Sequence, residues 1–434
     1  MERVIIIGGG LAGSEAALQL AERGIKVTLY EQRPVHMTPA HKTDSFAELV
    51  CSNSLKSTEE TNAHGLLKKE LNILGSILLK IAEKHRISHG KALVVDRAGF
   101  SKEVTKEIES HPNIEVRREK VDKIPEKRPV IVASGPLTEG KLAENLKMLI
   151  GEEFLHFYDA ISPIVDADSL NMDVLYFKDR HNIDNEAYLN APMTEEEYER
   201  FYEFIINAES FNSHEFDKVP YFEGCLPIEE MAKRGKLTLV FGPLSPKGLL
   251  NPKTGKMPFA VVQLRAENRE RTMYSLVGFQ TRLKRSEQEK LIKLIPGLEN
   301  AKILRYGQIH RNTFINAPGV ITPNLNLKKY PSIFIAGQLS GTEGYVEAIM
   351  GGLIAAINVY NLIRGKKLIP PPRHSMIGAL LSYISEGNGG VFQPMNANMG
   401  LLTDIPKGIK GKNRRIFKKE RAIKEIIEWK NRIL

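Results

Sequence analysis

The chain has 434 residues, enough for two or three domains, and its 42% hydrophobic and 26% charged content is that of a globular protein. The first apolar run, Val4 to Ile7, is too short for a signal peptide or a membrane span, so we expect a cytoplasmic protein with no membrane contact. The net charge of +9 leaves a polyanionic partner open.

The N-terminal segment predicts a dinucleotide-binding unit. A strand at Val4 to Ile7 leads into a glycine turn and a helix at Ser14 to Arg23, whose N-terminus favours a pyrophosphate. The next strand, 25–30, ends at Glu31, where a carboxylate can hydrogen-bond an adenosine ribose. Two glycines allow close approach of the backbone to the ligand and a third allows the helix to pack on the strand. The predicted contacts are Gly8, Gly9, Gly10, Leu11, Ala12 and Gly13.

The middle of the chain changes character. A helix is expected at Leu66 to Lys84 and a buried strand at 130–134, both before residue 160. From 161 to 275, an acidic and aromatic helical stretch at Thr194 to Glu209 alternates with loops rich in proline and glycine. This pattern indicates an inserted substrate domain.

A second glycine turn follows a strand at 333–336 and precedes an expected helix at Tyr345 to Leu362. It can supply a second wall and aim a helix N-terminus at a flavin ring, where negative charge accumulates on reduction. Since a nicotinamide enzyme needs only one such unit, FAD is favoured over NAD, and an ordinary packing turn is the alternative. The predicted contacts here are Gly337, Gln338, Glu343 and Gly344.

These elements predict an α/β protein with a Rossmann-like FAD-binding fold, an inserted α+β domain and a helical C-terminal segment. The expected ranges are 1–160 and 276–370 for the FAD-binding domain, 161–275 for the insertion, and 371–434 for the C-terminal segment. Residues 407–434 contain eleven basic and three acidic residues, and the spacing of Ile416, Ile423, Ile427 and Leu434 predicts an amphipathic helix with a docked face. Its basic face is either simply solvated or binds RNA or DNA.

The two cysteines, Cys51 and Cys225, exclude a disulfide framework and a four-cysteine metal site, and we predict no metal. Cys225 precedes Pro227, a good first residue for a helix, and a helix N-terminus favours the nucleophilic thiolate. A lone cysteine is nevertheless more often inert than catalytic. For Cys51, closeness in sequence to the first glycine turn is the one argument from the residues.

Five stretches, in the same order, resemble the folate- and FAD-dependent tRNA (uracil-5-)-methyltransferases. They are residues 44–55, 222–235, 260–268, 305–316 and 392–400. The likeness runs from Val4 to about Leu402, with departures at Ser245, Lys247 and 88–91, and the basic tail lies outside it.

The resemblance implies that Cys225 adds to C6 of a uracil, that methylenetetrahydrofolate donates the carbon, and that FAD carries the methylene and reduces it. NADPH or NADH would supply the electrons. Cys51 would act near the flavin, by removing the C5 proton or by guarding Cys225. The implied substrate is the T-loop uridine of tRNA, position 54, converted to ribothymidine.

The sequence leaves three other functions to consider. The same chemistry on a ribosomal RNA uridine is the nearest alternative, and nothing in the sequence separates the two RNAs. A flavin thiol-disulfide reductase would need a CxxC motif, which the chain lacks. A non-catalytic RNA-binding flavoprotein would be supported by loss of Cys225, which is present. The sequence predicts no protein partner and does not indicate the nicotinamide preference, the folate-contacting residues or the oligomeric state.

Overall fold

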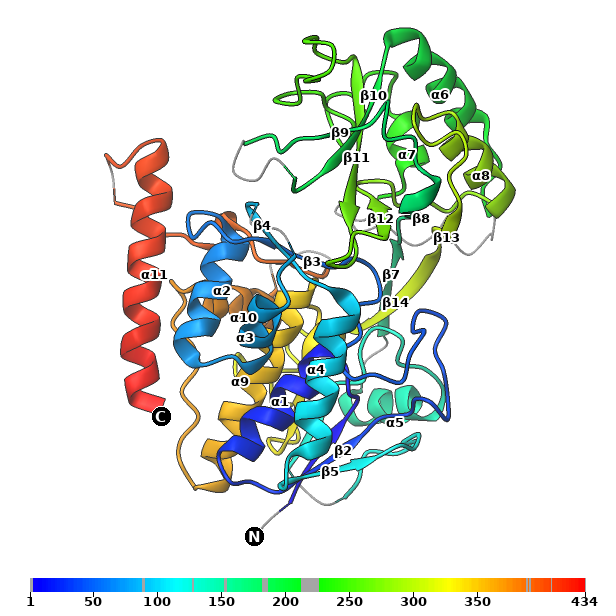
Figure 1. The fold of residues 1–434 in the computed structure, drawn as a ribbon. Helices are drawn as coiled ribbons and strands as arrows, with labels where there is room; N and C mark the ends of the chain where they lie inside the picture. Colours follow the sequence, from blue (N-terminus) through cyan, green and yellow to red (C-terminus); the bar gives the residue numbers. More distant parts are fainter. Residues whose placement is uncertain are drawn as a thin grey trace.

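Two sheets organise the chain into two lobes (Figure 1). The computed structural model describes residues 3–87, 90–126, 129–151, 154–181, 186–211, 226–387, 389, 392–406 and 408–433. Both ends of the described chain lie in the lower lobe of Figure 1, and the elements between residues 164 and 305 form the upper lobe.

The lower lobe is built on a parallel sheet with strand order β15-β6-β1-β2-β5. Its strands are β1 (Val4–Ile7), β2 (Val27–Tyr30), β5 (Ile114–Arg117), β6 (Val130–Val132) and β15 (Ile333–Ile335). Strands β1, β6 and β15 are apolar and fully buried, as in parallel sheets covered on both faces. Since β2 and β6 lie on opposite sides of β1, the strand order reverses there, and such sheets bind ligands at this point. The predicted Rossmann-like fold is confirmed.

Helices α1 (Leu11–Glu22) and α9 (Tyr345–Ile363) follow the two glycine turns and pack directly on each other. A Cβ added at Gly352 would lie 2.1 Å from the carbonyl oxygen of Ala12, and one at Gly351 would lie 2.7 Å from the amide nitrogen of Gly337. These close approaches bring the two turns together. Within the described part of the chain, α9 alone is long and apolar enough to cross a membrane, and 78% of its apolar window is buried inside the protein.

The single helix predicted at Leu66 to Lys84 is wrong, because the structure has two helices there. They are α2 (Ala63–Leu74) and α3 (Ile77–Lys84). Gly75 ends α2 with a left-handed φ of 87°, and the Ser76 hydroxyl then accepts a hydrogen bond from the Leu79 amide, which caps α3. In the sequence, the pair Gly75-Ser76 marks this break between the helices, although the apolar periodicity continues across it.

The upper lobe contains a six-stranded antiparallel sheet, ordered β13-β8-β12-β11-β10-β9. Its strands are β8 (Ile164–Asp166), β9 (Tyr176–Phe177), β10 (Leu189–Met193), β11 (Ala260–Ala266), β12 (Met273–Leu276) and β13 (Ile303–Arg305). Helices α6 (Glu195–Asn207), α7 (Ile228–Lys233) and α8 (Arg285–Lys293) share its hydrophobic core. This sheet therefore continues past residue 275, where the insertion was expected to end. The domain boundaries themselves stay predictions.

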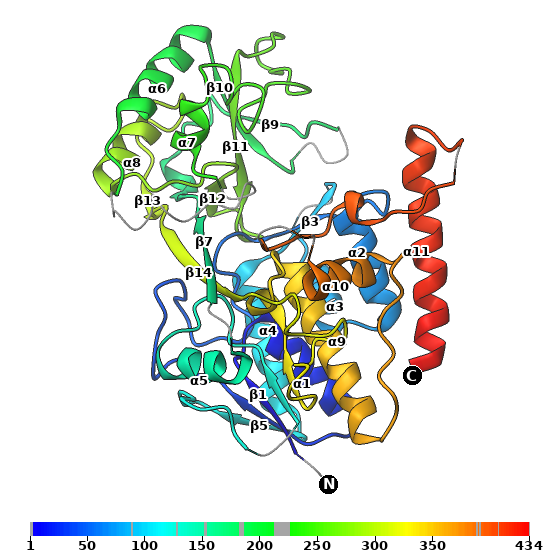
Figure 2. The ribbon, with the colours of Figure 1, turned by 180° about the vertical axis from the view of Figure 1, so that it is seen from behind.

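A two-stranded antiparallel ribbon joins the lobes (Figure 2). It consists of β7 (Phe154–Ala160) and β14 (Ile309–Ile315). Both crossings of the chain between the lobes therefore run side by side. Besides the C-terminal helices, the remaining elements are β3 (Ser54–Ser57), β4 (Ala92–Val94), α4 (Arg97–Ser110), α5 (Gly140–Ile150), η1 (Ala167–Ser169), η4 (Gly337–Ser340) and η5 (Met399–Leu401).

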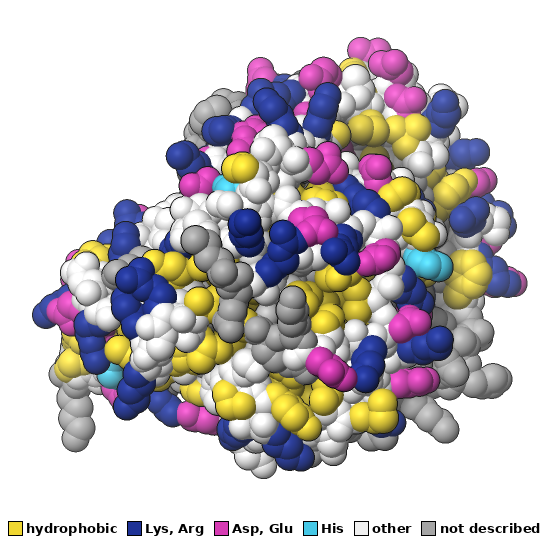
Figure 3. Space-filling model, turned by 90° about the horizontal axis from the view of Figure 1, so that it is seen from below, with side chains coloured by type: hydrophobic (Ala, Val, Ile, Leu, Met, Phe, Trp, Pro, Cys, Tyr) yellow, Lys and Arg dark blue, Asp and Glu magenta, His cyan; other side chains and the backbone are white. Residues whose placement is uncertain are grey.

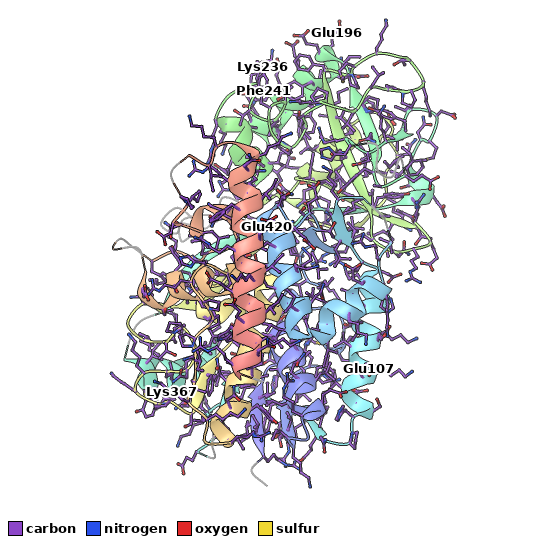
Figure 4. The ribbon with its side chains drawn as sticks, turned by 90° about the vertical axis from the view of Figure 1, so that its left-hand side faces the viewer. Glu107, Glu196, Lys236, Phe241, Lys367 and Glu420 are labelled. Carbon is purple, nitrogen blue, oxygen red and sulfur yellow. The ribbon has the colours of Figure 1, made fainter. Side chains whose placement is uncertain are left out.

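The C-terminal segment is helical, with α10 (Met376–Glu386) and α11 (Lys412–Ile433). Helix α11 lies along α2 on the outside of the lower lobe (Figure 4). The predicted amphipathic helix is confirmed, but its docked face is only partly the expected one: Ile423 packs against the core, Ile416 and Ile427 are exposed, and Leu434 lies outside the described residues. The face that packs on the lobe consists of Ala422, Ile426, Trp429 and Ile433.

Candidate active site

A cavity of about 430 Å³ lies where the two glycine turns meet, and it extends to Arg265 and Gln280 of the upper lobe. Nearly every residue predicted to hold the dinucleotide lines it, together with Cys51. These are Gly8, Gly9, Gly10, Leu11, Ala12, Glu31, Gly337, Gln338, Glu343 and Gly344. The other predicted thiol, Cys225, lies outside the described residues. The structure thus brings two distant turns and the Cys51 thiol to a single site.

The glycines of the first turn serve different purposes. Gly8 has a φ of 103°, and an added Cβ would lie 2.4 Å from the carbonyl oxygen of Ala133. At Gly13, which does not line the cavity, an added Cβ would lie 1.8 Å from the carbonyl oxygen of Gly8. At Gly10 an added Cβ would meet no heavy atom of the described chain within 4 Å. The fold itself requires Gly8 and Gly13, whereas Gly10 leaves open space that a ligand can fill.

Two helix N-termini border the cavity. Gly10 and Gly344 are the N-cap residues of α1 and α9, and neither has a side chain that caps the first turn. Their backbone N–H groups and helix dipoles therefore favour a negatively charged group in the cavity. This arrangement fits FAD, because the flavin has a pyrophosphate and a ring that gains negative charge on reduction.

The second turn is braced by its own residues and by the C-terminal segment. The Gln338 side-chain amide donates to the Glu343 carboxylate. The Glu343 amide donates to the Met395 carbonyl at 2.9 Å, and the Met395 amide donates to the Gly341 carbonyl at 3.0 Å. Segment 392–406 therefore forms the outer support of this wall.

Glu31 is buried and engaged by protein donors. Its carboxylate accepts hydrogen bonds from the Gly9 amide at 2.9 Å and from the Arg33 amide and Nε, both at 2.9 Å, and Arg33 Nη2 donates at 3.1 Å. Burial disfavours its charge, but Arg33 outweighs burial and lowers the pKa of Glu31. Since these four bonds use the carboxylate's acceptor sites, a ribose hydroxyl must displace one of them.

Three side chains form hydrogen bonds to the backbone of the loop that carries Cys51. The Tyr345 hydroxyl, at the start of α9, accepts from the amides of Cys51 at 2.7 Å and Ser52 at 3.0 Å. Arg305 donates to the Val50 carbonyl at 2.5 Å, and Arg97 donates to the Leu49 carbonyl. Cys51 is thereby fixed on the cavity wall.

Tyr345 can also act toward a ligand. Burial raises its pKa above the ordinary value, so the hydroxyl stays protonated. Its oxygen accepts the two loop amides, and its own proton is a further donor. Because Tyr345 lines the cavity, this hydroxyl can donate a hydrogen bond to a bound molecule.

Polar contacts near Cys51 also tie the lobes together. Arg97 of α4 forms an ion pair with Glu267 of the upper lobe at 2.7 Å. Arg265 of β11 donates to Asn53 Oδ1 at 2.8 Å and to Ser52 Oγ at 2.9 Å. Arg265 and Glu267 both belong to the motif 260–268, but no feature of that motif indicated that Arg265 contacts the Cys51 loop or that Glu267 pairs with Arg97. These contacts join residues some two hundred positions apart, which no local pattern reveals.

A buried polar pair lies behind the second turn. Glu347 Oε1 accepts from the Ala397 amide at 2.9 Å and lies 3.4 Å from His64 Nε2, and Glu347 also lines the cavity. Its other oxygen, Oε2, is buried and has no hydrogen-bond partner within the described structure. Burial, with the positive charges of Lys56 and Lys68, lowers the pKa of His64 to about 3, so His64 is neutral at pH 7.

Comparisons with known proteins show which family this chain resembles. A family model described as glucose inhibited division protein A matches residues 3–367. The methylenetetrahydrofolate--tRNA-(uracil-5-)-methyltransferase of Halalkalibacterium halodurans is 53% identical over 410 residues, 94% of each chain. Its counterpart in Natranaerobius thermophilus is 51% identical over 432 residues, 100% of each chain. The solved structure of Aquifex aeolicus GidA has a TM-score of 0.72 at 19% identity, covers 99% of this chain and 73% of that chain, and shows a shared fold.

Proposed function

The chain belongs to the methylenetetrahydrofolate--tRNA-(uracil-5-)-methyltransferase family, and from this membership we propose the position, electron source and residues of its reaction. The target is the T-loop uridine of tRNA, position 54, which becomes ribothymidine. NADPH or NADH supplies the electrons. The observation that carries the proposal is the meeting of both glycine turns and Cys51 at one cavity in a chain with such relatives.

FAD is assigned to this cavity. The turn at Gly8 to Gly10 and the N-terminus of α1 would hold its pyrophosphate, and the turn at Gly337 to Gly344 with the N-terminus of α9 would hold its ring. Bound there, FAD supplies the transfer of the one-carbon unit from methylenetetrahydrofolate and the electrons that reduce it. The protein's part is to bind, orient and exclude water around the reacting atoms.

Cys225 is proposed as the nucleophile. Its thiolate adds to C6 of the uracil, and the electron pair of the C5–C6 double bond moves toward C5 and O4, which makes C5 nucleophilic. C5 then bonds to the one-carbon unit and loses its proton to a base, and the bond that held this unit to its carrier breaks, with the electron pair returning to the carrier. Two electrons from NADPH or NADH reduce that unit to a methyl group, and departure of the sulfur from C6 restores the double bond.

Cys51 is proposed to act beside the flavin. Its loop is fixed by Tyr345, Arg97 and Arg305, so its thiol keeps one place on the cavity wall. A fixed thiol at this place can take the C5 proton, or it can guard Cys225 when no substrate is bound. Removing the Cys51 thiol distinguishes the two roles. If Cys51 is the base, turnover is abolished, and if it only protects Cys225, freshly prepared enzyme still turns over.

The test is nucleoside mass spectrometry on unmodified tRNA and on ribosomal RNA fragments. Each RNA is incubated with the protein, NADPH or NADH, and methylenetetrahydrofolate. The proposal expects 5-methyluridine at position 54 of the tRNA and none in the ribosomal fragments. If ribosomal RNA is methylated instead, the substrate is ribosomal RNA and the proposed reaction is unchanged.

A further inference from the structure

Positive charge is concentrated in the first half of α11 and the residues just before it. Residues 408–421, here called the basic half, contain seven basic residues and one acid. The basic residues are Lys410, Lys412, Arg414, Arg415, Lys418, Lys419 and Arg421. The acid is Glu420, which Figure 4 places midway along the helix. The rest of α11, residues 422–433, has three basic and two acidic residues and is nearly balanced.

The charge of the basic half is not compensated by the fold. Every residue from Lys410 to Ile416 is exposed. Lys418 and Arg421 donate to backbone carbonyls, those of Met399 at 2.6 Å and Thr403 at 2.6 Å. No ion pair to a carboxylate of the described chain involves any of the seven basic side chains. Burial, together with the charges of Arg414 and Arg421, lowers the pKa of Lys418, as expected where positive charges repel one another.

The underside of the molecule differs from the basic half. On the underside, shown in Figure 3, Lys and Arg side chains alternate with Asp and Glu. Balanced charges of that kind are typical of a solvated protein surface. An unbalanced row along one helix is instead typical of a surface that meets a polyanion.

We propose that the basic half of α11 binds the phosphate backbone of the tRNA substrate. The stretch from Lys412 to Arg421 is about 15 Å long, so it can contact more than one phosphate of a strand. The inference rests on tRNA being the substrate. It adds a contact surface on a segment that lies outside the five motif stretches.

The basic half is also placed to influence the cavity. Through Met399 it contacts the segment that supports the second glycine turn, and in that segment the Ala397 amide donates to Glu347, which lines the cavity. In Figure 1 the N-terminal end of α11 points toward the upper lobe. The path of contacts from the basic half thus ends at a residue that lines the cavity.

A membrane is a poorer partner for this helix. Amphipathic helices bind membranes by inserting their apolar face. The apolar face of α11, with Ile426 and Trp429, is buried on the lower lobe, and Trp429 Nε1 donates to the Ile369 carbonyl at 3.0 Å. Deleting the whole helix would expose this core, so substitutions at exposed positions test the surface better than a truncation.

The experiment compares two triple variants of the full-length holoenzyme. The test variant is Lys412→Gln, Arg414→Gln and Arg415→Gln, all at exposed positions. The control removes the same charge at exposed residues away from the basic half: Lys328→Gln, Lys366→Gln and Lys367→Gln. The affinity of each protein for an unmodified tRNA transcript is measured over a series of KCl concentrations.

In the test variant, the slope of log affinity against log salt should shrink by about 0.7 to 0.9 for each phosphate that the protein no longer neutralises. The KM for tRNA should rise, with kcat unchanged at saturating tRNA. The control should match the wild type. An unchanged slope in the test variant, or an equal change in the control, overturns the inference. The inference is also overturned if the test variant loses binding to phosphatidylserine vesicles but keeps its affinity for tRNA. If the wild type binds tRNA with the expected slope but does not methylate it, the proposed function fails while this inference stands.

Discussion

The Tyr345 hydroxyl lies 2.7 Å from the amide nitrogen of Cys51 and accepts its hydrogen bond. Tyr345 is the first residue of the helix that follows the second glycine turn, and Cys51 lies on the loop between β2 and β3. One phenol thus couples the wall assigned to the flavin ring with the loop that carries a thiol. This coupling predicts that Tyr345 is needed for turnover rather than for holding FAD.

Tyr345→Phe leaves the amides of Cys51 and Ser52 without their acceptor, at a cost of about 1 to 3 kcal/mol in the free energy of unfolding. We expect FAD to stay bound while kcat falls at least tenfold, because the Cys51 loop is no longer fixed. The matched control is Tyr176→Phe, a buried tyrosine of the upper lobe that donates to the Leu249 carbonyl at 2.7 Å. Urea unfolding and steady-state kinetics give the comparison, and equal kcat in the two variants would contradict it.

Gly10→Val should give colourless protein that is still folded. The added side chain enters open space in the cavity, where we place the pyrophosphate, and its Cβ meets no atom of the described chain. Gly8→Val should instead prevent folding, because its Cβ would lie 2.4 Å from the Ala133 carbonyl oxygen. Absorbance near 450 nm reports FAD, and circular dichroism of the cofactor-free proteins reports folding. If Gly10→Val protein is yellow and retains FAD, the pyrophosphate does not bind at this turn.

Stability should fall with acid partly because of His64. Its pKa of about 3 in the folded state is below the value of about 6.5 in an unfolded chain. Below pH 6.5 the unfolded state therefore binds a proton that the folded state does not, and stability that is present above pH 6.5 is lost as the pH falls toward 3. The loss is about 1.4 kcal/mol per pH unit at most.

His64→Gln should remove this part of the slope between pH 6.5 and 4, as measured by urea unfolding at each pH. His36→Gln, at an exposed position, serves as the control and should keep the wild-type slope. If His64→Gln also retains the full slope, the buried neutral state of His64 is not the cause.

The glycine turns were predictable because each role depends on a few consecutive residues. Gly8, Gly10 and Gly13 have fixed spacing after a strand, and the structure gives each a distinct physical reason. The contact between Cys51 and Tyr345 was not predictable, since it joins residues 294 positions apart. Fold class follows from periodicity and local turns, whereas the surroundings of a reactive group depend on contacts that only the folded chain creates.

Two predictions, the single helix at Leu66 to Lys84 and the residues of the docked face of α11, were incorrect or incomplete for a related reason. Apolar spacing marks where a helix can pack, but a left-handed Gly75 divides the first helix, and packing on α2 selects Trp429 rather than Ile427 in the second. Glu31 was expected beside a ribose, and nothing in its sequence position indicated that Arg33 would engage the same carboxylate.

The most direct test follows the source of the methyl carbon. Unmodified tRNA is incubated with wild type, Cys225→Ala or Cys51→Ala protein, with label either in methylenetetrahydrofolate or in S-adenosylmethionine. We predict labelled 5-methyluridine from methylenetetrahydrofolate alone, dependent on NADPH or NADH, and none from Cys225→Ala protein that retains FAD. Cys51→Ala protein should be severely impaired if Cys51 takes the C5 proton. Label arriving from S-adenosylmethionine, or full activity in Cys225→Ala, would contradict the account.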